Sequence, residues 1–265
     1  MPGYEFVAYE ASGGIATATL RRPEKLNAFH EGMLRELRAL LGEVVGRDDL
    51  RVLILTGAGR AFCAGADFAW FDVEGLGREP TARFRAMAAA THGLFDQIEA
   101  LEKPVIAAIN GLCVGGGLEL ALACDLRVAA EDAALGLPEV NAGIIPGSGG
   151  CSRLVRLIGS ARAKELIFTG DLIAAAEAQG MGLVNRVVPA ADLVPAARRL
   201  GEKLLAKAPQ ALGMAKLLIN NAENVDSATG RVLDRLGQSV LLPTADAAEG
   251  ARAFRAKRPP AFTGR

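Results

Sequence analysis

The chain has 265 residues, of which 51% are hydrophobic and 23% charged, so it can bury a substantial core. Thirty basic residues balance thirty acidic ones, and the formal net charge is zero. This balance argues against nucleic acid or an anionic membrane as a partner. Apolar runs end well before the roughly 18 residues of a membrane span, and the N-terminal residues lack a secretory pattern, so we expect a cytoplasmic protein.

Metal and catalytic-triad chemistry have little support in this sequence. The two histidines, His30 and His92, have no partner at metal-ligand spacing, so we predict no metal site. The cysteines are widely separated, which is typical of thiols in a reducing compartment. They are Cys63, Cys113, Cys124 and Cys151.

Strand and helix patterns alternate along the first 190 residues. Strands are predicted at 4–10, 15–20, 52–56, 104–110, 126–129 and 184–188. Helices are predicted at 32–45, 82–100, 115–124 and in stretches of 160–181, with an irregular segment at 66–80. Such alternation predicts an α/β protein with crossover connections and a mainly parallel sheet covered on its faces.

The pattern changes after Pro189. Only helical segments follow, over 192–255, with interruptions at Pro209 and Pro243. We therefore divide the chain into a strand–helix core over 1–190 and a helical segment over 191–265. No internal repeat is visible in the sequence.

A glycine cluster, Gly115 to Gly117, separates a predicted strand from a predicted helix. Backbone N–H groups there can approach a ligand closely, and the start of a helix favours a developing negative charge. A simple tight turn is the alternative. A phosphate loop is disfavoured, because Leu118 and Glu119 replace its Lys-Ser/Thr pair and a carboxylate repels phosphate.

A second glycine-bearing turn, TGAGRAFCAGAD, covers residues 56–67. It fails as a dinucleotide fingerprint because Phe62 occupies the third glycine position. Residues 64–67 can supply another backbone N–H that faces the first glycine cluster. Two convergent donors would form an oxyanion hole, in which each contributes about 3 kcal/mol.

Two carboxylates, Glu119 and Glu139, lie in segments that are otherwise nearly free of charge. Burial should raise the pKa of both, and neighbouring carboxyls titrate as a pair. One protonated and one ionised carboxyl can hold a water molecule and add it across a polarised double bond. For Glu119, a favourable interaction with the helix dipole is the simpler alternative.

The chain resembles the enoyl-CoA hydratase/isomerase, or crotonase, superfamily over nearly its whole length. The matching motifs are LRRPEKLNAF at 20–29, GAGRAFCAGAD at 57–67, PVIAAINGLCVGGGLELALACD at 104–125, LGLPEVNAGIIPGSGG at 135–150, ARAKELIFTG at 161–170, GLVNRVVP at 182–189 and KRPPAF at 257–262. The resemblance implies a crotonase-like spiral of stacked strand–helix turns with a helical C-terminal trimerisation segment. It also implies a homotrimer or a dimer of trimers.

The resemblance further implies an enzyme of acyl-CoA and fatty-acid metabolism. The expected reaction is reversible syn addition of water to a 2-enoyl-CoA, giving a 3-hydroxyacyl-CoA through an oxyanion-stabilised thioester enolate. By similarity, the N–H groups of Ala66 and Gly116 bind the thioester oxygen, while Glu119 and Glu139 hold the water. Glu139 also exchanges the α-proton. No further cofactor is implied, because coenzyme A is part of the substrate.

The residues expected to contact CoA or substrate come from three segments. They are Lys25, Leu26, Ala28, Ala64, Asp67, Phe68 and Lys257. For Lys257, a solvated charge on the chain terminus is an equal alternative.

Two features depart from the family pattern. Cys151-Ser152-Arg153 replaces the usual Thr-Gln-Arg, and the segment after Asp67 is long and aromatic. Its rings either pack in the core or line a pocket for aromatic or alicyclic acyl groups. The alternative activities are therefore an enoyl-CoA isomerase or a ring-opening or alicyclic acyl-CoA hydratase or hydrolase. An RNA-binding relative is a remote alternative that the zero net charge disfavours.

Overall fold

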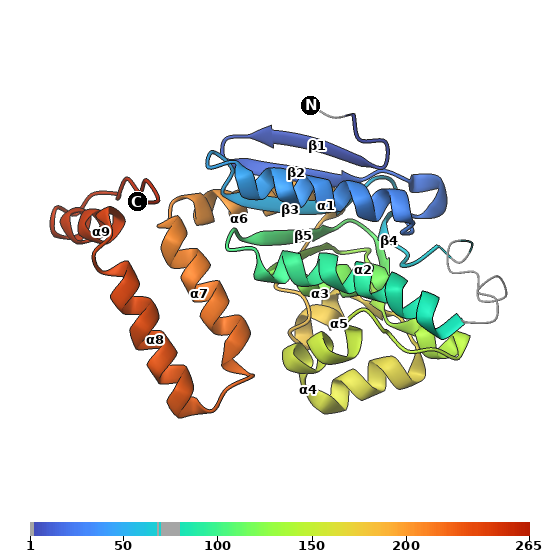
Figure 1. The fold of residues 1–265 in the computed structure, drawn as a ribbon. Helices are drawn as coiled ribbons and strands as arrows, with labels where there is room; N and C mark the ends of the chain where they lie inside the picture. The colour runs from blue at the N-terminus through green and yellow to red at the C-terminus, as the bar shows by residue number, and fades with distance from the viewer. Residues whose placement is uncertain (1–2, 68, 70–79) are drawn as a thin grey trace.

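A six-stranded sheet forms the centre of the computed structural model, which describes residues 3–67, 69 and 80–265 (Figure 1). Its strand order is β1-β2-β3-β5-β7-β10. The β1–β2 pair is antiparallel and the other pairs are parallel, as predicted. The strands are β1 (Val7–Ser12), β2 (Ile15–Leu20), β3 (Val52–Gly57), β5 (Val105–Ile109), β7 (Leu126–Ala130) and β10 (Arg186–Val188).

Both faces of this sheet are covered by helices. Successive residues of β3 point to opposite sides, so Leu53 joins one apolar cluster and Ile54 the other. Helices α1 (Glu31–Gly46), α2 (Pro80–Ala100) and α3 (Gly116–Ala123) contribute to the first cluster. The six apolar residues of the predicted helical face of α1 are all buried: Met33, Leu34, Leu37, Leu40, Leu41 and Val44.

A second sheet, which the sequence patterns did not predict, has the order β4-β6-β8-β9. Its strands are β4 (Ala61–Cys63), β6 (Leu112–Val114), β8 (Ala134–Gly136) and β9 (Ile173–Ala174). Strands β4, β6 and β8 are parallel, and each follows a strand of the central sheet, namely β3, β5 and β7. A helix comes next in each case: α2, α3 and finally α4 (Gly150–Thr169). These three strand–strand–helix turns form the expected spiral.

Helices occupy most of the remaining chain. Helix α4 begins ahead of the predicted stretch and contains a kink at Gly159, and α5 (Ala175–Gly180) follows it. Short 3₁₀ turns are η1 (Pro23–Lys25), η3 (Pro138–Ala142) and η4 (Ala190–Asp192). Every helix in the described residues is too short or too polar to cross a bilayer.

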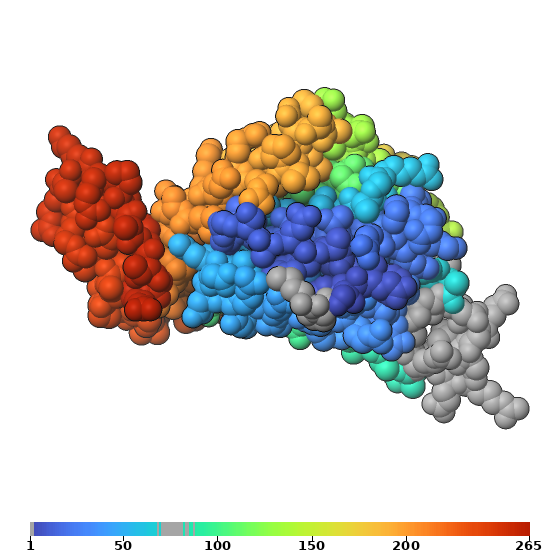
Figure 2. Space-filling view, turned by 90° about the horizontal axis from the view of Figure 1, so that it is seen from above, coloured from blue at the N-terminus to red at the C-terminus, as the bar shows by residue number. Residues whose placement is uncertain are grey.

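The C-terminal helices divide into two groups. Helix α6 (Leu193–Leu205) packs on the second face of the central sheet, where Leu193 and Ala197 meet Ile54 and Val128. Helices α7 (Pro209–Ala222), α8 (Ser227–Leu241) and α9 (Ala245–Arg255) extend away from the sheet (Figures 1 and 2). Residue 190 thus marks the end of the strands, whereas the projecting part begins with Pro209 at the first turn of α7.

A buried ion pair attaches α7 to the core. Lys216 Nζ lies 2.9 Å from Asp125 Oδ2 and donates to Ile98 O at 3.1 Å. The same Asp125 oxygen accepts from Val105 N at 2.6 Å. Burial raises the pKa of Asp125, and the Lys216 charge opposes this rise. The lysine therefore compensates a carboxylate that would otherwise be costly to bury.

We predict that Lys216→Met lowers the free energy of unfolding by about 3 kcal/mol, because it leaves the Asp125 charge uncompensated. The exposed Lys203 on α6 provides a matched control, and Lys203→Met should change stability by less than about 0.5 kcal/mol. Urea denaturation monitored by circular dichroism measures both values. Equal stabilities of the two variants would contradict the role of the ion pair.

Candidate active site

The carboxyl ends of β4, β6 and β8 bring three distant segments together. These strands are neighbours and parallel, so their carboxyl ends lie at one edge of the second sheet. Strand β4 leads to Ala66, β6 leads to Gly116, and β8 leads to Glu139 in η3. The pairing of three short strands therefore assembles the predicted site.

The backbones that carry Ala66 and Gly116 are in close contact. Gly65 has a φ of 88°, and a Cβ atom added there would lie 3.0 Å from Gly116 N and 3.2 Å from Val114 O. Only glycine fits this approach. The two predicted donors are therefore held on adjacent loops.

Both N–H groups are available to a ligand. Phe29 forms a parallel bridge in which it donates to Gly65 O at 2.7 Å and accepts from Asp67 N at 2.8 Å. The N–H of Ala66 consequently points to the other side of the chain. Gly116 is the first residue of α3, so its N–H has no acceptor within the helix. Two such donors, one of them at a helix start, can stabilise an oxyanion.

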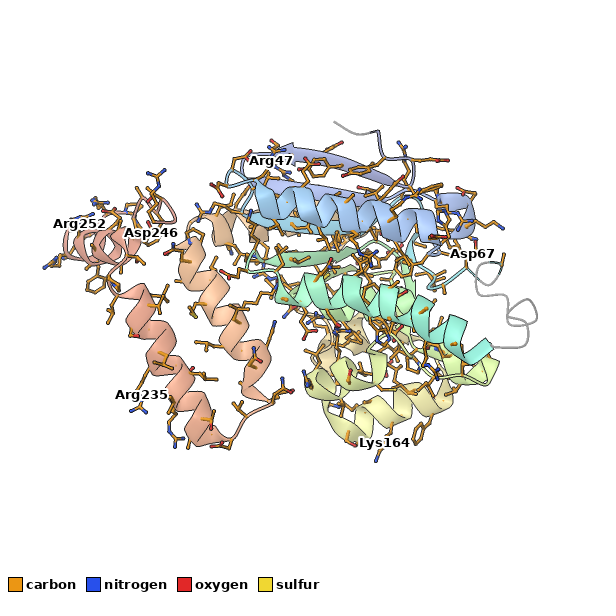
Figure 3. All side chains as sticks on the ribbon, in the orientation of Figure 1. Arg47, Asp67, Lys164, Arg235, Asp246 and Arg252 are labelled. Carbon is orange, nitrogen blue, oxygen red and sulfur yellow. The ribbon has the colours of Figure 1, made fainter. Side chains whose placement is uncertain are left out.

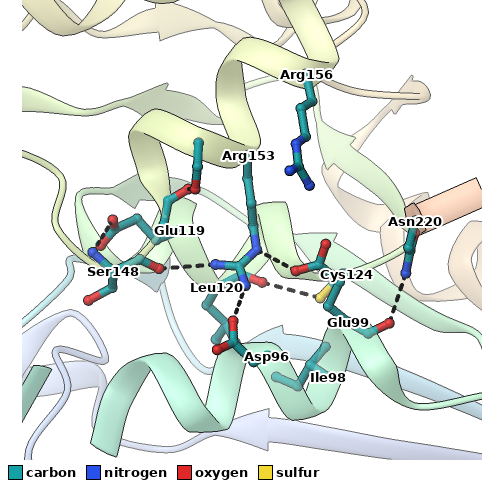
Figure 4. A network of polar contacts seen from close by, with 12 residues as sticks. Asp96, Ile98, Glu99, Glu119, Leu120, Cys124, Ser148, Arg153, Arg156 and Asn220 are labelled. Carbon is teal, nitrogen blue, oxygen red and sulfur yellow. Dashed lines mark hydrogen bonds and ion pairs between the residues drawn. The ribbon is translucent and has the colours of Figure 1, made fainter. Parts of the chain in front are cut away.

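Glu119 is buried in the first turn of α3, with 3% of its surface exposed. Its Oε1 atom accepts hydrogen bonds from Ser148 N at 2.6 Å and Gly150 N at 2.8 Å (Figure 4). Burial raises the pKa of Glu119, whereas the two N–H groups and the charge of Arg153 oppose the rise. The two hydrogen bonds favour the ionised carboxylate.

Glu139 lies next to the glycine cluster and has a different environment. A Cβ atom on Gly115 would lie 3.1 Å from Glu139 Oε1. The Oε2 atom of Glu139 is buried and has no hydrogen-bond partner among the described residues. Burial, and to a smaller extent the charge of Glu119, raises the pKa of Glu139 to about 7. Glu139 therefore retains its proton to a higher pH than an ordinary glutamate, beside a Glu119 whose two N–H donors favour the ionised form.

Arg153 supports the Glu119 loop and was not predicted as a site residue. Its Nη1 atom donates to Ser148 O at 3.1 Å. Its other nitrogens pair with Asp96 at 2.6 Å and Glu99 at 2.8 Å. The sequence offered one signal, a basic residue three positions after the glycine turn at 147–150.

The predicted CoA segment lies beside β4. Leu26 O accepts from Ala64 N at 3.0 Å, which places Lys25, Leu26 and Ala28 next to the oxyanion loop. Leu26 and Asn27 both have left-handed backbones, with φ values of 52° and 56°. Such strain often marks a binding site.

Buried polar contacts maintain this strained turn. Asn27, which is fully buried, accepts from Arg22 N at 2.8 Å and donates to Ala58 O and Ala61 O. Arg22 in turn pairs with Asp67 at 2.8 Å. Asp67 was predicted from the sequence as a ligand contact, whereas the supporting contacts of Asn27 and Arg22 were not, because they are made with distant parts of the chain.

Two predicted ligand contacts are not placed beside the others. Phe68 lies outside the described residues, as do Trp70, Phe71 and the side chain of Phe84. Lys257 is exposed and lies two residues after α9, whose Asp246 and Arg252 lie at the opposite end of the molecule from Asp67 (Figure 3). Within a single chain, Lys257 does not join the site, and its contact with CoA stays a prediction.

The described residues contain no group of three or more His, Cys, Asp or Glu side chains that is suited to hold a metal ion. Three of the cysteines are buried thiols, and burial raises the pKa of Cys63 and Cys124 to about 12. Cys151 is exposed at the start of α4. The chemistry that the site offers is therefore that of two carboxyls and two backbone donors.

Known proteins similar in sequence identify the family of this chain. The sequence profile of the enoyl-CoA hydratase/isomerase family matches residues 10–265. The chain belongs to this family. It is 38% identical to a short-chain-enoyl-CoA hydratase of Clostridium acetobutylicum, over 95% of each chain, and 38% identical to a crotonyl-CoA hydratase of Syntrophomonas wolfei, over 96% of each.

A solved structure confirms the family fold. The enoyl-CoA hydratase from Bacillus anthracis superposes with a TM-score of 0.93 at 41% identity. The match covers 98% of this chain and 100% of that one. The crotonase-like spiral with a helical C-terminal segment, which the family motifs implied, is thus confirmed.

The raised pKa of Glu139 predicts a pH-dependent stability. Between its ordinary value of 4.5 and about 7, the folded state retains a proton that the unfolded state releases, so rising pH destabilises the wild-type protein. Glu139→Gln removes this titration. The variant should match the wild type near pH 4.5 and become the more stable protein by pH 7.5, as measured by urea denaturation across this range. A stability difference independent of pH would contradict the prediction.

Proposed function

We propose that this protein catalyses the reversible syn hydration of a 2-enoyl-CoA to a 3-hydroxyacyl-CoA. The observation that carries the proposal is the placement of Glu119 and Glu139 beside the open N–H groups of Ala66 and Gly116. The hydratase names of its relatives support the same reaction class. Coenzyme A enters as part of the substrate, and the carboxyls supply the acid–base chemistry.

In the proposed reaction, the thioester carbonyl oxygen lies between the N–H groups of Ala66 and Gly116. These donors and the positive end of α3 stabilise the negative charge of the enolate as it develops. Polarisation of the carbonyl makes C3 of the alkene electrophilic. The same interaction lowers the pKa of the α-proton in the reverse direction.

The two carboxyls divide the proton transfers. Ionised Glu119 takes one proton from water while the water oxygen bonds to C3, and protonated Glu139 gives its proton to C2. Delivery from one face of the alkene gives syn addition. In the reverse reaction, Glu139 removes the α-proton and Glu119 returns a proton to the departing hydroxyl. A pKa near 7 suits this exchange, because a catalytic group works best near the operating pH.

We predict that Glu139→Gln lowers kcat for hydration of crotonyl-CoA by about 10²–10⁴-fold, because the amide cannot supply the proton. Binding of a saturated acyl-CoA should be retained, as measured by calorimetry. The exposed Glu131 gives a matched control, and Glu131→Gln should keep wild-type turnover.

A panel of short, long, aromatic and alicyclic enoyl-CoAs, with product identification, tests the reaction class. A 3-hydroxyacyl-CoA is the expected product. A shifted double bond or a ring-opened acid as the main product would replace the hydratase proposal by an isomerase or hydrolase. Unchanged turnover in Glu139→Gln would disprove the mechanism.

We also propose that the protein forms a homo-oligomer, a trimer or a dimer of trimers, which assembles through the projecting helices. Helix α8 packs one face on α7, where Gly237 meets Met214 and Leu218. Its other side exposes Val232, Leu236 and Val240, which recur every four residues. An apolar stripe of this kind on a projecting helix favours a protein partner.

We predict that Leu236→Glu converts the oligomer to a smaller species, because the charge would be buried in the interface. Light scattering coupled to size-exclusion chromatography measures the mass. Val45→Glu introduces the same charge at an exposed apolar position of α1 and should leave the mass unchanged. A monomeric wild-type protein, or equal masses for the wild type and Leu236→Glu, would contradict this assembly.

A further inference from the structure

The backbone that holds Glu119 has little intrinsic rigidity. Ser148 is surrounded by Gly147, Gly149 and Gly150, and Gly149 has a left-handed φ of 100°. Glycine-rich backbone samples many conformations unless other groups restrain it. Both N–H groups that bind Glu119 nevertheless come from this loop. Their directions must therefore be fixed by contacts elsewhere.

Three successive peptide units of the loop each have their carbonyl group held. A peptide unit is planar and trans, so fixing its C=O also fixes its N–H on the opposite side. The N–H groups of the first and third units are those that bind Glu119. The carbonyl of Gly147 accepts a hydrogen bond from His92 Nε2. The carbonyl of Ser148 accepts one from Arg153 Nη1 at 3.1 Å, and that of Gly149 accepts one from Arg153 N at 2.9 Å.

The first two contacts are made by side chains, and both depend on one stripe of α2, whereas the third is made by the backbone N–H of Arg153. His92, Asp96 and Glu99 follow each other at intervals of four and three residues, so they share a face of the helix. Asp96 and Glu99 form ion pairs with different nitrogens of the Arg153 guanidinium, and only 10% of the Arg153 side chain is exposed (Figure 4). A planar guanidinium held by two carboxylates has a well-defined orientation.

We propose that His92 and Arg153 are positioning residues, which aim the Ser148 and Gly150 N–H groups at Glu119. Asp96 and Glu99 hold Arg153 for this task. The inference rests on the proposed function, because hydration requires an ionised and correctly oriented Glu119. The two residues act through the loop, so their loss affects the chemical step and leaves binding of the CoA portion intact.

The first test compares disruptive and conservative variants at both positions. His92→Leu and Arg153→Met should each lower kcat for crotonyl-CoA by about 10–100-fold, with KM changed by less than about threefold. His92→Gln should restore most of the turnover, because its amide N–H can donate to Gly147 O. Arg153→Lys should restore part of it, and Glu99→Gln gives a milder loss should Arg153→Met fail to fold.

Arg156 provides a matched control on the same helix. It lies one turn beyond Arg153 but contacts Glu223 at 3.3 Å and Asn224 at 2.8 Å, away from the loop. Arg156→Met removes the same charge and a similar area from α4. Its kcat should stay within about twofold of the wild type.

A second measurement does not depend on activity. The amide hydrogens of Ser148 and Gly150 should exchange with solvent about tenfold faster in Arg153→Met and His92→Leu, but not in Arg156→Met. The pH profile gives a third readout. Glu119 faces Arg153, Glu139 and Cys151, and loss of the arginine charge should raise the pKa of Glu119, which moves the acid limb of kcat/KM to higher pH.

Three results would overturn the inference. They are wild-type kcat together with wild-type amide exchange, a rise in KM alone, and His92→Gln as impaired as His92→Leu. Failure of the proposed function is separately visible. If the wild-type protein hydrates no enoyl-CoA in the panel, the hydratase assignment falls, while the exchange rates still decide whether the two side chains fix the loop.

Discussion

Burial of Glu119 is the constraint on which the site depends. A carboxylate in the first turn of an apolar helix loses its hydration, and this loss must be offset by groups that solvate the charge. Two peptide N–H groups do so, and they come from a loop that has few buried side chains of its own. The same two hydrogen bonds therefore restrain the loop and stabilise the ionised form of Glu119.

The same desolvation acts unequally on the two carboxyls. Glu119 has hydrogen-bond donors and Glu139 has none for its buried Oε2, so their proton affinities differ although their chemistry is identical. Polar solvation of one acid and apolar burial of the other is a general way to obtain an acid and a base near neutral pH. The arrangement costs stability at Glu139, which is typical of catalytic groups.

The sequence predicted the central sheet and α1 because their apolar residues recur over four or more positions. It did not predict β4, β6 or β8, because triplets such as AFC, LCV and ALG are too short to show a period. The start of α4 was also missed, since Gly149 offers no side-chain cap to mark it. The three strand–strand–helix turns share geometry without sharing sequence, so no repeat was visible.

The candidate site was predictable to the extent that residue type alone reveals chemistry. Acidic residues in apolar surroundings and two glycine-bearing turns pointed to Glu119, Glu139 and backbone donors within 64–67 and 115–117, whereas the choice of Ala66 and Gly116 came from the family resemblance. Their convergence depends on strand pairing, and Arg153 acts through partners more than fifty positions away. No local pattern encodes such contacts. They could be recognised only once the neighbouring elements were in place.

Glu99 contacts both Arg153 and α7, the first of the projecting helices. Its carboxylate holds Arg153, while its backbone carbonyl accepts a hydrogen bond from Asn220 of α7 at 2.9 Å. One turn of α2 therefore contacts both Arg153 and the helix that leads to the exposed stripe of α8. Lys216 binds the preceding carbonyl, that of Ile98, and fixes α7 at the same place. These contacts are consecutive on a packed helix, so Arg153 and α7 share Glu99 as a common neighbour.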